Sequence, residues 1–269
     1  MKKLCTIIFT LLLSFTLCAC GSSNPIDEKA LDQFETSMNK VSEMKAAYYA
    51  ATLNMKTNEN TVDLSLNGAF KNDPLNFNLK VGMSSVTDGE ETKYDNLLSV
   101  AMDDKYTYMN LMDFMKSKTP VGEMKEELPD TKEAFKLDRE EFKKYLTKAS
   151  LKNGKVHFEF DGEKLSEGFK NILKDEDFIA QDPTGMLDVA DDYENISFKN
   201  AILDIDTKDD MPTDVTFSVN MENVIDGVTN GGDITIRLSF SDVNGDVKVE
   251  MPSDADSYEL MDDSASFLE

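Results

Sequence analysis

Apolar residues alternate with polar ones over much of this chain, and this period of two constrains the fold more than any other feature. In the stretch TVDLSLNGAF, Val62, Leu64 and Leu66 alternate with polar residues, and LNFNLKVGM continues the pattern from Leu75 to Met83. A period of two places every second side chain on the same face of a β-strand. The turn-rich stretch KNDP separates the two segments, which predicts an antiparallel hairpin.

Further segments show the same alternation and predict a sheet of many strands. These segments are Tyr48–Met55, KYDNLLSVAM, KYTYMNL, GKVHFEFDG, ISFKNAILDID, DVTFSVNMENV, GDITIRLSFSDV and the short GDVKVEMP. The first strands are joined by connections short enough for an antiparallel meander. Because each strand has one polar face, we expect the sheet to bury one side and to keep the other in water.

A period of three and four residues predicts helices at the start and in the middle of the chain. Asp27 is an N-cap candidate, and Ala30, Phe34, Met38 and Val41 then form one apolar stripe. Helices are also expected in NLMDFMKSK, in LDREEFKKYLTKA, which opens with a capping box, and in EKLSEGFKNILKDEDF. An antiparallel sheet needs a cover for its apolar face, and these helices are the available cover, which predicts an α+β fold.

The first twenty residues have the order of an export signal. Lys2 and Lys3 precede a mostly apolar run from Cys5 to Leu17, which is shorter than the roughly 20 residues needed to span a bilayer. We therefore predict that residues 1–19 form a signal peptide and not a part of the folded domain.

The end of this segment, Leu17-Cys18-Ala19-Cys20-Gly21, resembles the lipobox of bacterial lipoproteins. The family pattern is leucine, a small residue, alanine or glycine, and then cysteine; Cys18 stands where alanine, serine or threonine is commoner. The resemblance implies that the sulfur of Cys20 receives a diacylglycerol and that the chain is cut after Ala19. Two acyl chains give firm membrane attachment, whereas a single chain gives only marginal binding.

Processing would leave Cys20 as the single cysteine of the mature chain. Since the resemblance assigns its sulfur to a lipid, no thiol remains for a disulfide, a zinc site or redox chemistry. The fold must therefore be held by its core, for which the chain is long enough. We expect no cofactor and no metal ion.

The chain is strongly acidic, with a formal charge of −24 that becomes −26 when Lys2 and Lys3 are removed. This charge argues against binding nucleic acid and against lying on an anionic membrane. It either keeps the domain soluble or attracts a cationic protein or cell-wall partner. Among 28 basic residues only Arg139 and Arg237 are arginines, which indicates an AT-rich Gram-positive genome. The predicted location is the outer, extracytoplasmic face of the cell membrane.

One folded domain is expected after the signal. Residues 20–26 form a tether, residues 27–252 a single domain with a helical insertion at about 110–180, and residues 253–269 an acidic tail expected to be disordered. A tether this short would keep the domain close to the membrane.

This order of elements resembles the LolA-like superfamily, which includes the LppX/LprG-type mycobacterial lipoproteins. The likeness lies in the lipobox at Cys20, the helix and meander that begin at Asp27, and the closing LSFSDVNGDVKVEMPSDAD. It implies a strongly curved antiparallel half-barrel with helices on its concave side. Family members with known roles carry acyl chains or lipidated molecules between helices and sheet, so the resemblance implies a lipid or other apolar ligand.

Apolar strand residues and a methionine-rich segment are the candidate lining of a ligand cavity. Met109, Met112 and Met115 recur by threes, which suits either a pliable apolar surface or ordinary core packing. The full set of candidates is Leu66, Phe77, Leu79, Met112, Met115, Phe217, Val219, Ile236 and Leu238. The alternative is an acidic interaction or scaffold module with a packed core and no ligand.

Catalytic and metal-binding patterns are weak in this sequence. The single histidine, His157, alternates with Val156 and Phe158, which predicts a solvent-side strand position, and no Gly-x-Ser-x-Gly elbow accompanies it. The acidic groups at 204–210 and 242–246 do not have the spacing of an EF-hand loop and are interpreted as turns. We therefore expect no enzymatic activity.

Overall fold

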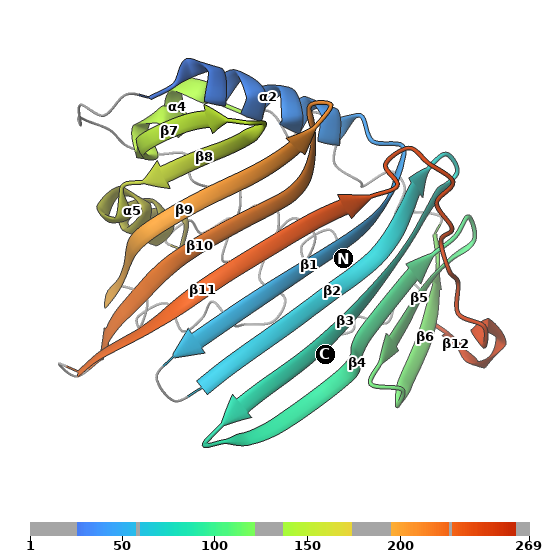
Figure 1. Cartoon of the computed structure of the whole chain (residues 1–269). Helices are drawn as coiled ribbons and strands as arrows, with labels where there is room; N and C mark the ends of the chain where they lie inside the picture. The colour runs from blue at the N-terminus through green and yellow to red at the C-terminus, as the bar shows by residue number, and fades with distance from the viewer. Residues whose placement is uncertain (1–25, 58–59, 122–136, 174–194, 226–227, 262–269) are drawn as a thin grey trace.

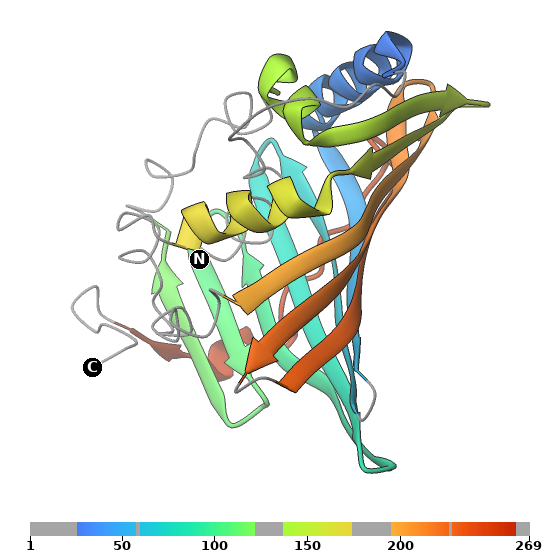
Figure 2. The same ribbon diagram turned by 90° about the vertical axis from the view of Figure 1, so that its left-hand side faces the viewer.

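A single antiparallel sheet dominates the computed structural model, which describes residues 26–57, 60–121, 137–173, 195–225 and 228–261. Within these residues twelve strands lie in the order β12-β6-β5-β4-β3-β2-β1-β11-β10-β9-β8-β7. The sheet is curved and does not close into a barrel (Figures 1 and 2). The predicted α+β class and the curved antiparallel sheet are confirmed.

The described elements follow the chain in this order: α2 (Glu28–Ser42), β1 (Ala46–Thr57), β2 (Asn60–Asn72), β3 (Leu75–Thr87), β4 (Glu90–Met102), β5 (Tyr106–Leu111), β6 (Met115–Pro120), α4 (Arg139–Tyr145), β7 (Leu146–Lys152), β8 (Lys155–Phe160), α5 (Gly162–Leu173), β9 (Ile196–Lys208), β10 (Met211–Ile225), β11 (Val228–Ser241), the 3₁₀ turn η2 (Ala255–Ser257) and β12 (Glu259–Leu260). Strand β1 pairs with β2 and with the distant β11, which joins the two halves of the sheet. None of the described helices is long and apolar enough to cross a membrane.

Helix α2 begins as its sequence predicts. The Asp27 side chain accepts a hydrogen bond from the backbone N–H of Lys29 at 3.0 Å, which satisfies one free donor of the first turn. Ala30, Leu31 and Phe34 are buried on one face of the helix. That face packs on β7, β8 and β10, so the N-terminal helix covers the β7 end of the sheet.

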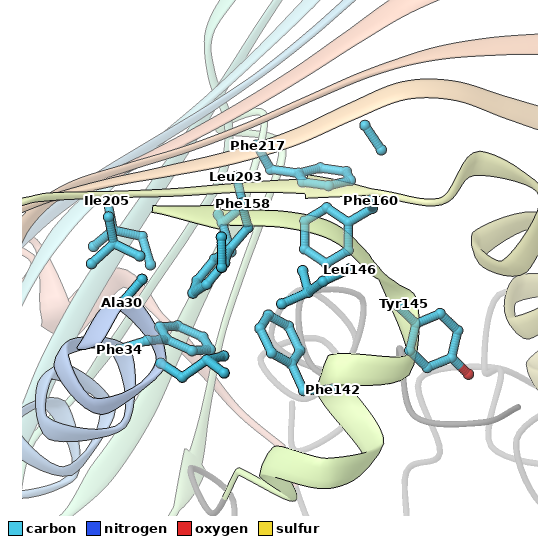
Figure 3. Close-up of a cluster of buried hydrophobic side chains, with 14 of the residues drawn as sticks. Ala30, Phe34, Phe142, Tyr145, Leu146, Phe158, Phe160, Leu203, Ile205 and Phe217 are labelled. Carbon is cyan, nitrogen blue, oxygen red and sulfur yellow. The ribbon is translucent and has the colours of Figure 1, made fainter. Parts of the chain in front are cut away.

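A cluster of phenylalanine rings fixes this end of the fold (Figure 3). Phe34 from α2, Phe142 from α4 and Phe158 from β8 lie with ring centroids 5.2–5.4 Å apart. Burial of each such side chain contributes about 1.5–3 kcal/mol. Arg139 also joins α4 to α2 through 2.6 Å contacts with Glu28 and Asp32. Both acids are largely exposed, and exposed ion pairs contribute only about 0–1 kcal/mol, so apolar packing dominates.

One predicted helix is absent from the structure, and another is shorter than predicted. The segment NLMDFMKSK forms the end of β5, a turn and the start of β6. Met112 and Asp113 adopt positive φ there, and the Asn110 side chain accepts from the Asp113 N–H at 3.0 Å, which closes the turn. The helix in LDREEFKKYLTKA ends at Tyr145, because Leu146 onward pairs with β8. The predicted helical insertion at about 110–180 therefore contains β6, β7 and β8 as well as α4 and α5.

The end of the chain crosses the convex face of the sheet. Residues 246–261, termed here the C-terminal strap, are extended in their first part, and GDVKVEMP is not a strand of the sheet as predicted, although its Val247 is fully buried. Tyr258 packs edge-on against Tyr108 at 5.5 Å, and β12 pairs in parallel with β6. The predicted disorder of residues 253–269 is thus wrong for residues 253–261; residues 262–269 lie outside the described part.

Candidate functional site

One face of the sheet is apolar across eight neighbouring strands, from β10 to β6. Pairing aligns successive apolar side chains into rows that cross the strands. One row joins Phe217, Ile236, Leu53, Leu64 and Met83. The next row runs Val215, Leu238, Ala51, Leu66, Val81, Leu98, Leu111 and Met115. Neither row contains a charged or hydrogen-bonding side chain, so this surface is suited to apolar matter alone.

The apolar face is the concave one. Phe217 and Val219 of β10 belong to the buried cluster that packs beneath α2 and α4, and those helices lie on the concave side (Figures 2 and 3). Helix α5 packs on β9 of the same end. Of the described residues, that cluster contains none from β1–β6. The described helices pack over β7–β10, and the predicted cover of the concave face as a whole is not confirmed.

Along the row that starts at Phe217, burial falls from the helix-covered end towards the middle of the sheet, although Leu79 on the same face of β3 is 7% exposed. Phe217 and Val219 are 9% and 6% exposed, whereas Leu53, Leu66 and Ile236 are only half-buried. A half-buried apolar row in the middle of a wide sheet is the kind of surface that monomeric proteins seldom leave to water. The concave side of β11, β1, β2 and β3 is consequently the candidate binding surface.

Eight of the nine sequence-predicted lining residues lie on this face: Leu66, Phe77, Leu79, Met115, Phe217, Val219, Ile236 and Leu238. Met112 does not, because it occupies the left-handed turn between β5 and β6, where it is 41% exposed. On a helix, the three-residue spacing of Met109, Met112 and Met115 would place their side chains on one face. In the observed hairpin Met109 and Met115 stay on the concave face, and Met112 lies at the tip.

His157 lies on the opposite side of β8 from Val156 and Phe158, as predicted. Its Nδ1 is 2.9 Å from Asp204 Oδ1 and its Nε2 is 3.1 Å from Glu159 Oε1. A serine nucleophile would need Nε2 for its own proton, and here a carboxylate occupies that position. The arrangement is a cross-strand polar cluster and not a catalytic triad.

The two acidic groups serve turns and local contacts. Asp209 and Asp210 adopt positive φ in the β9–β10 turn, and Asp210 accepts from the Gln33 side chain at 3.2 Å. The Asn244 side chain accepts from the Lys45 N–H at 2.7 Å, which ties the β11 end to the start of β1. In the described part of the chain no three His, Cys, Asp or Glu side chains are placed to hold a metal ion.

The sequence predicted GDVKVEMP as a short strand but did not reveal the rest of the C-terminal strap or the surface beneath it. Val247, Val249 and Met251 alternate with charged residues, which indicates an extended segment with one buried side. Residues 253–261 are acidic and have no such alternation, so no local pattern indicated that they are ordered.

Several proteins with solved structures resemble this chain in their structure. No protein-family model and no curated protein matches it. The lipoprotein LppX of Mycobacterium tuberculosis matches with 12% identity over 83% of this chain and all of that one, at a TM-score of 0.35. LprF from Mycobacterium bovis matches with 9% identity over 85% and 99% of the two chains, also at 0.35. A LolA-superfamily protein of Nitrosomonas europaea matches with 8% identity over 86% and 96%, at 0.23.

These matches include LppX-type and LolA-type proteins, the groups that the sequence resembles. Identities of 8–12% and TM-scores of 0.35 or below assign no ligand and no activity to this chain.

The polar cluster on β8 predicts a pH-dependent contribution to stability. The Lys148 ammonium and the His157 ring lower the pKa of the Glu159 carboxyl from its ordinary value of 4.5. A carboxyl with a lowered folded-state pKa stabilises the fold above its ordinary pKa and loses that contribution as the pH falls through the lowered value. We expect Glu159→Gln to lower the free energy of unfolding at neutral pH, and the difference from wild type to shrink below pH 4.5.

Denaturant unfolding across the acid range measures this difference. Glu163→Gln, at an exposed position of α5, is the control. A wild-type advantage that stays constant into strong acid would contradict the assignment.

Proposed function

We propose that this protein is a lipid-anchored extracytoplasmic lipoprotein that binds a lipid or another apolar ligand on the concave face of its sheet and has no enzymatic activity. The observation that carries the proposal is the set of uncharged apolar rows, half-buried over β11, β1, β2 and β3. The described helices pack at the β7–β10 end, next to this surface and not across it.

The energetics favour a ligand with a long apolar chain. Each buried methylene contributes about 0.8 kcal/mol, so about ten methylenes contribute roughly 8 kcal/mol. Association itself costs an estimated 4–15 kcal/mol in lost freedom. A short chain would therefore not be held, whereas a long acyl chain gains enough to offset this cost. A charged head group would find no partner in the rows and would stay at the open side.

The ligand proposal predicts that a charge on the concave face abolishes tight binding. Leu66 lies in the middle of β2 between Ala51 and Val81, and Ser65 beside it points to the other face. We expect Leu66→Asp to weaken binding of the fluorescent fatty acid cis-parinaric acid by about tenfold or more, because a carboxylate beside the apolar chain costs at least about 1.4 kcal/mol. Ser65→Asp should bind as wild type does.

Fluorescence titration measures the affinity, and thermal unfolding shows that both variants are folded. Equal affinity of a folded Leu66→Asp variant and wild type would exclude the concave face as the site. Native mass spectrometry of gently extracted protein then identifies the natural ligand by mass.

The anchor is proposed from the sequence, because Cys20 and residues 1–19 lie outside the described residues. Without the thiol of residue 20 no diacylglycerol can be attached. We expect Cys20→Ser to leave the signal uncut or to release the protein from membranes, as followed by fractionation and gel mobility. Cys18→Ser is the matched control and should stay lipidated. Unchanged membrane attachment of Cys20→Ser would contradict the lipobox assignment.

A second candidate function, docking of a cationic partner, is favoured by the tips of the β3–β4 and β5–β6 hairpins. Phe114 is 72% exposed at the β5–β6 tip, and Tyr94 near the start of β4 is 43% exposed. The Asn96 side chain donates to Asp113 at 3.4 Å, which places the β5–β6 turn beside the middle of β4. Glu90, Glu91 and Asp95 are exposed in the first part of β4, where Asp95 pairs with Lys93 at 2.8 Å. A partner with basic and apolar side chains complements such a surface.

This docking role predicts a contact at position 114 in cells. A photo-crosslinking residue at position 114 should give one salt-sensitive adduct, because screening weakens attraction between exposed charges. The same residue at Thr52, exposed on β1, should give none. The measurement is gel electrophoresis of cross-linked membranes, and identical adduct patterns at the two positions would contradict docking at the hairpin tip.

A further inference from the structure

The C-terminal strap and the convex face of the sheet enclose a groove. This groove lies on the opposite face of the sheet from the proposed apolar site. This groove has a volume of about 690 Å³ and lies between the strap and strands β1–β5. Ligand pockets for small molecules typically measure about 300–1,000 Å³, so the groove has room for a ligand.

The groove is held open by fixed contacts along the strap. The backbone N–H of Lys248 donates to the Tyr48 hydroxyl at 3.0 Å, and the Asn78 side chain donates to the Glu250 carbonyl, also at 3.0 Å. Farther along, Lys116 pairs with Asp254 at 2.7 Å. The packing of Tyr258 on Tyr108 anchors the far end. A pocket whose walls are already fixed loses little entropy when a ligand binds.

Polar side chains form a row across the floor of this groove. Cross-strand pairing aligns Asn67, Lys80, Ser99 and Asn110 on β2, β3, β4 and β5. Neighbouring strands lie about 4.8 Å apart, so the row extends over roughly 14 Å. The side chains of Asn67 and Ser99 make no hydrogen bond to any described residue, and both line the groove. Their donors and acceptors are therefore available to a ligand.

Charges of both signs line the groove. Lys80 and Lys248 contribute positive charge and Glu250 contributes negative charge, while Asp254 is already paired with Lys116. A strongly charged ligand would therefore meet repulsion as well as attraction. The amide and hydroxyl groups between them favour a neutral ligand rich in hydroxyl and amide groups.

The floor of the groove favours a saccharide over a peptide that binds as an added strand. A peptide that binds as an added strand needs an unpaired sheet edge. Strands β1–β5 are paired on both sides, so the floor of the groove offers side chains and no free strand edge. We propose that the groove beneath the C-terminal strap binds a neutral oligosaccharide, with Asn67 and Ser99 as direct hydrogen-bonding residues.

Isothermal titration of the detergent-solubilised, full-length mature protein tests this site. The probes are maltotetraose and the tetrasaccharide of N-acetylglucosamine, and at least one of them should bind. Asn67→Ala and Ser99→Ala should each weaken that binding by about five- to tenfold, the effect of losing one net hydrogen bond. Thr52→Ala, at an exposed β1 position outside the groove, should have no effect.

Three results would overturn the proposal. The first is the absence of binding by both probes. The second is binding that is unchanged in the Asn67→Ala/Ser99→Ala double variant. The third is competition by cis-parinaric acid, which would place the saccharide on the concave face. Failure of fatty-acid binding leaves this test unaffected, because the two sites lie on opposite faces of the sheet.

Discussion

The need to shield one apolar face of an unclosed sheet from water governs this structure. Helices α2, α4 and α5 meet that need at the β7–β10 end, where three phenylalanine rings from separate elements interlock. The burial of this cluster stabilises the fold more than the ion pairs at Arg139 do, since these lie at the surface. Over the central strands the same apolar rows continue with less cover, and the candidate binding surface follows from that difference.

The two faces of the sheet carry different chemistry because side chains alternate along every strand. The concave rows hold leucine, isoleucine, valine, methionine and phenylalanine, which suits an apolar chain. The convex face holds amides, hydroxyls and lysines, and the C-terminal strap crosses it. The pairing of β1 with β11 joins the first strand of the chain to its last long strand, so both faces run without a break through the middle of the sheet.

Local patterns predicted the strands well and the helices less well. The alternation of apolar and polar residues correctly predicted β2, β3, β8 and β11, and the N-cap at Asp27 correctly predicted the start of α2. The error at Met112 has a definite cause, because spacing by threes fits a helix but also fits two strands joined by a tight left-handed turn. The error after Tyr145 arose because backbone pairing with β8 outweighed the helical preference of the local sequence. The strap was missed because its partners, such as Tyr48 and Tyr108, lie more than a hundred residues away.

The sequence by itself determined which side chains share a strand face, because alternation depends only on neighbouring residues. It thereby placed eight of the nine lining candidates on one side of the sheet, and it alone supports the lipid anchor at Cys20. Tertiary structure decided which strands became neighbours, how far the helices extend over the concave face, and that residues 246–261 enclose a groove. Those outcomes depend on contacts between segments far apart in the chain, and no local period of the sequence encodes them.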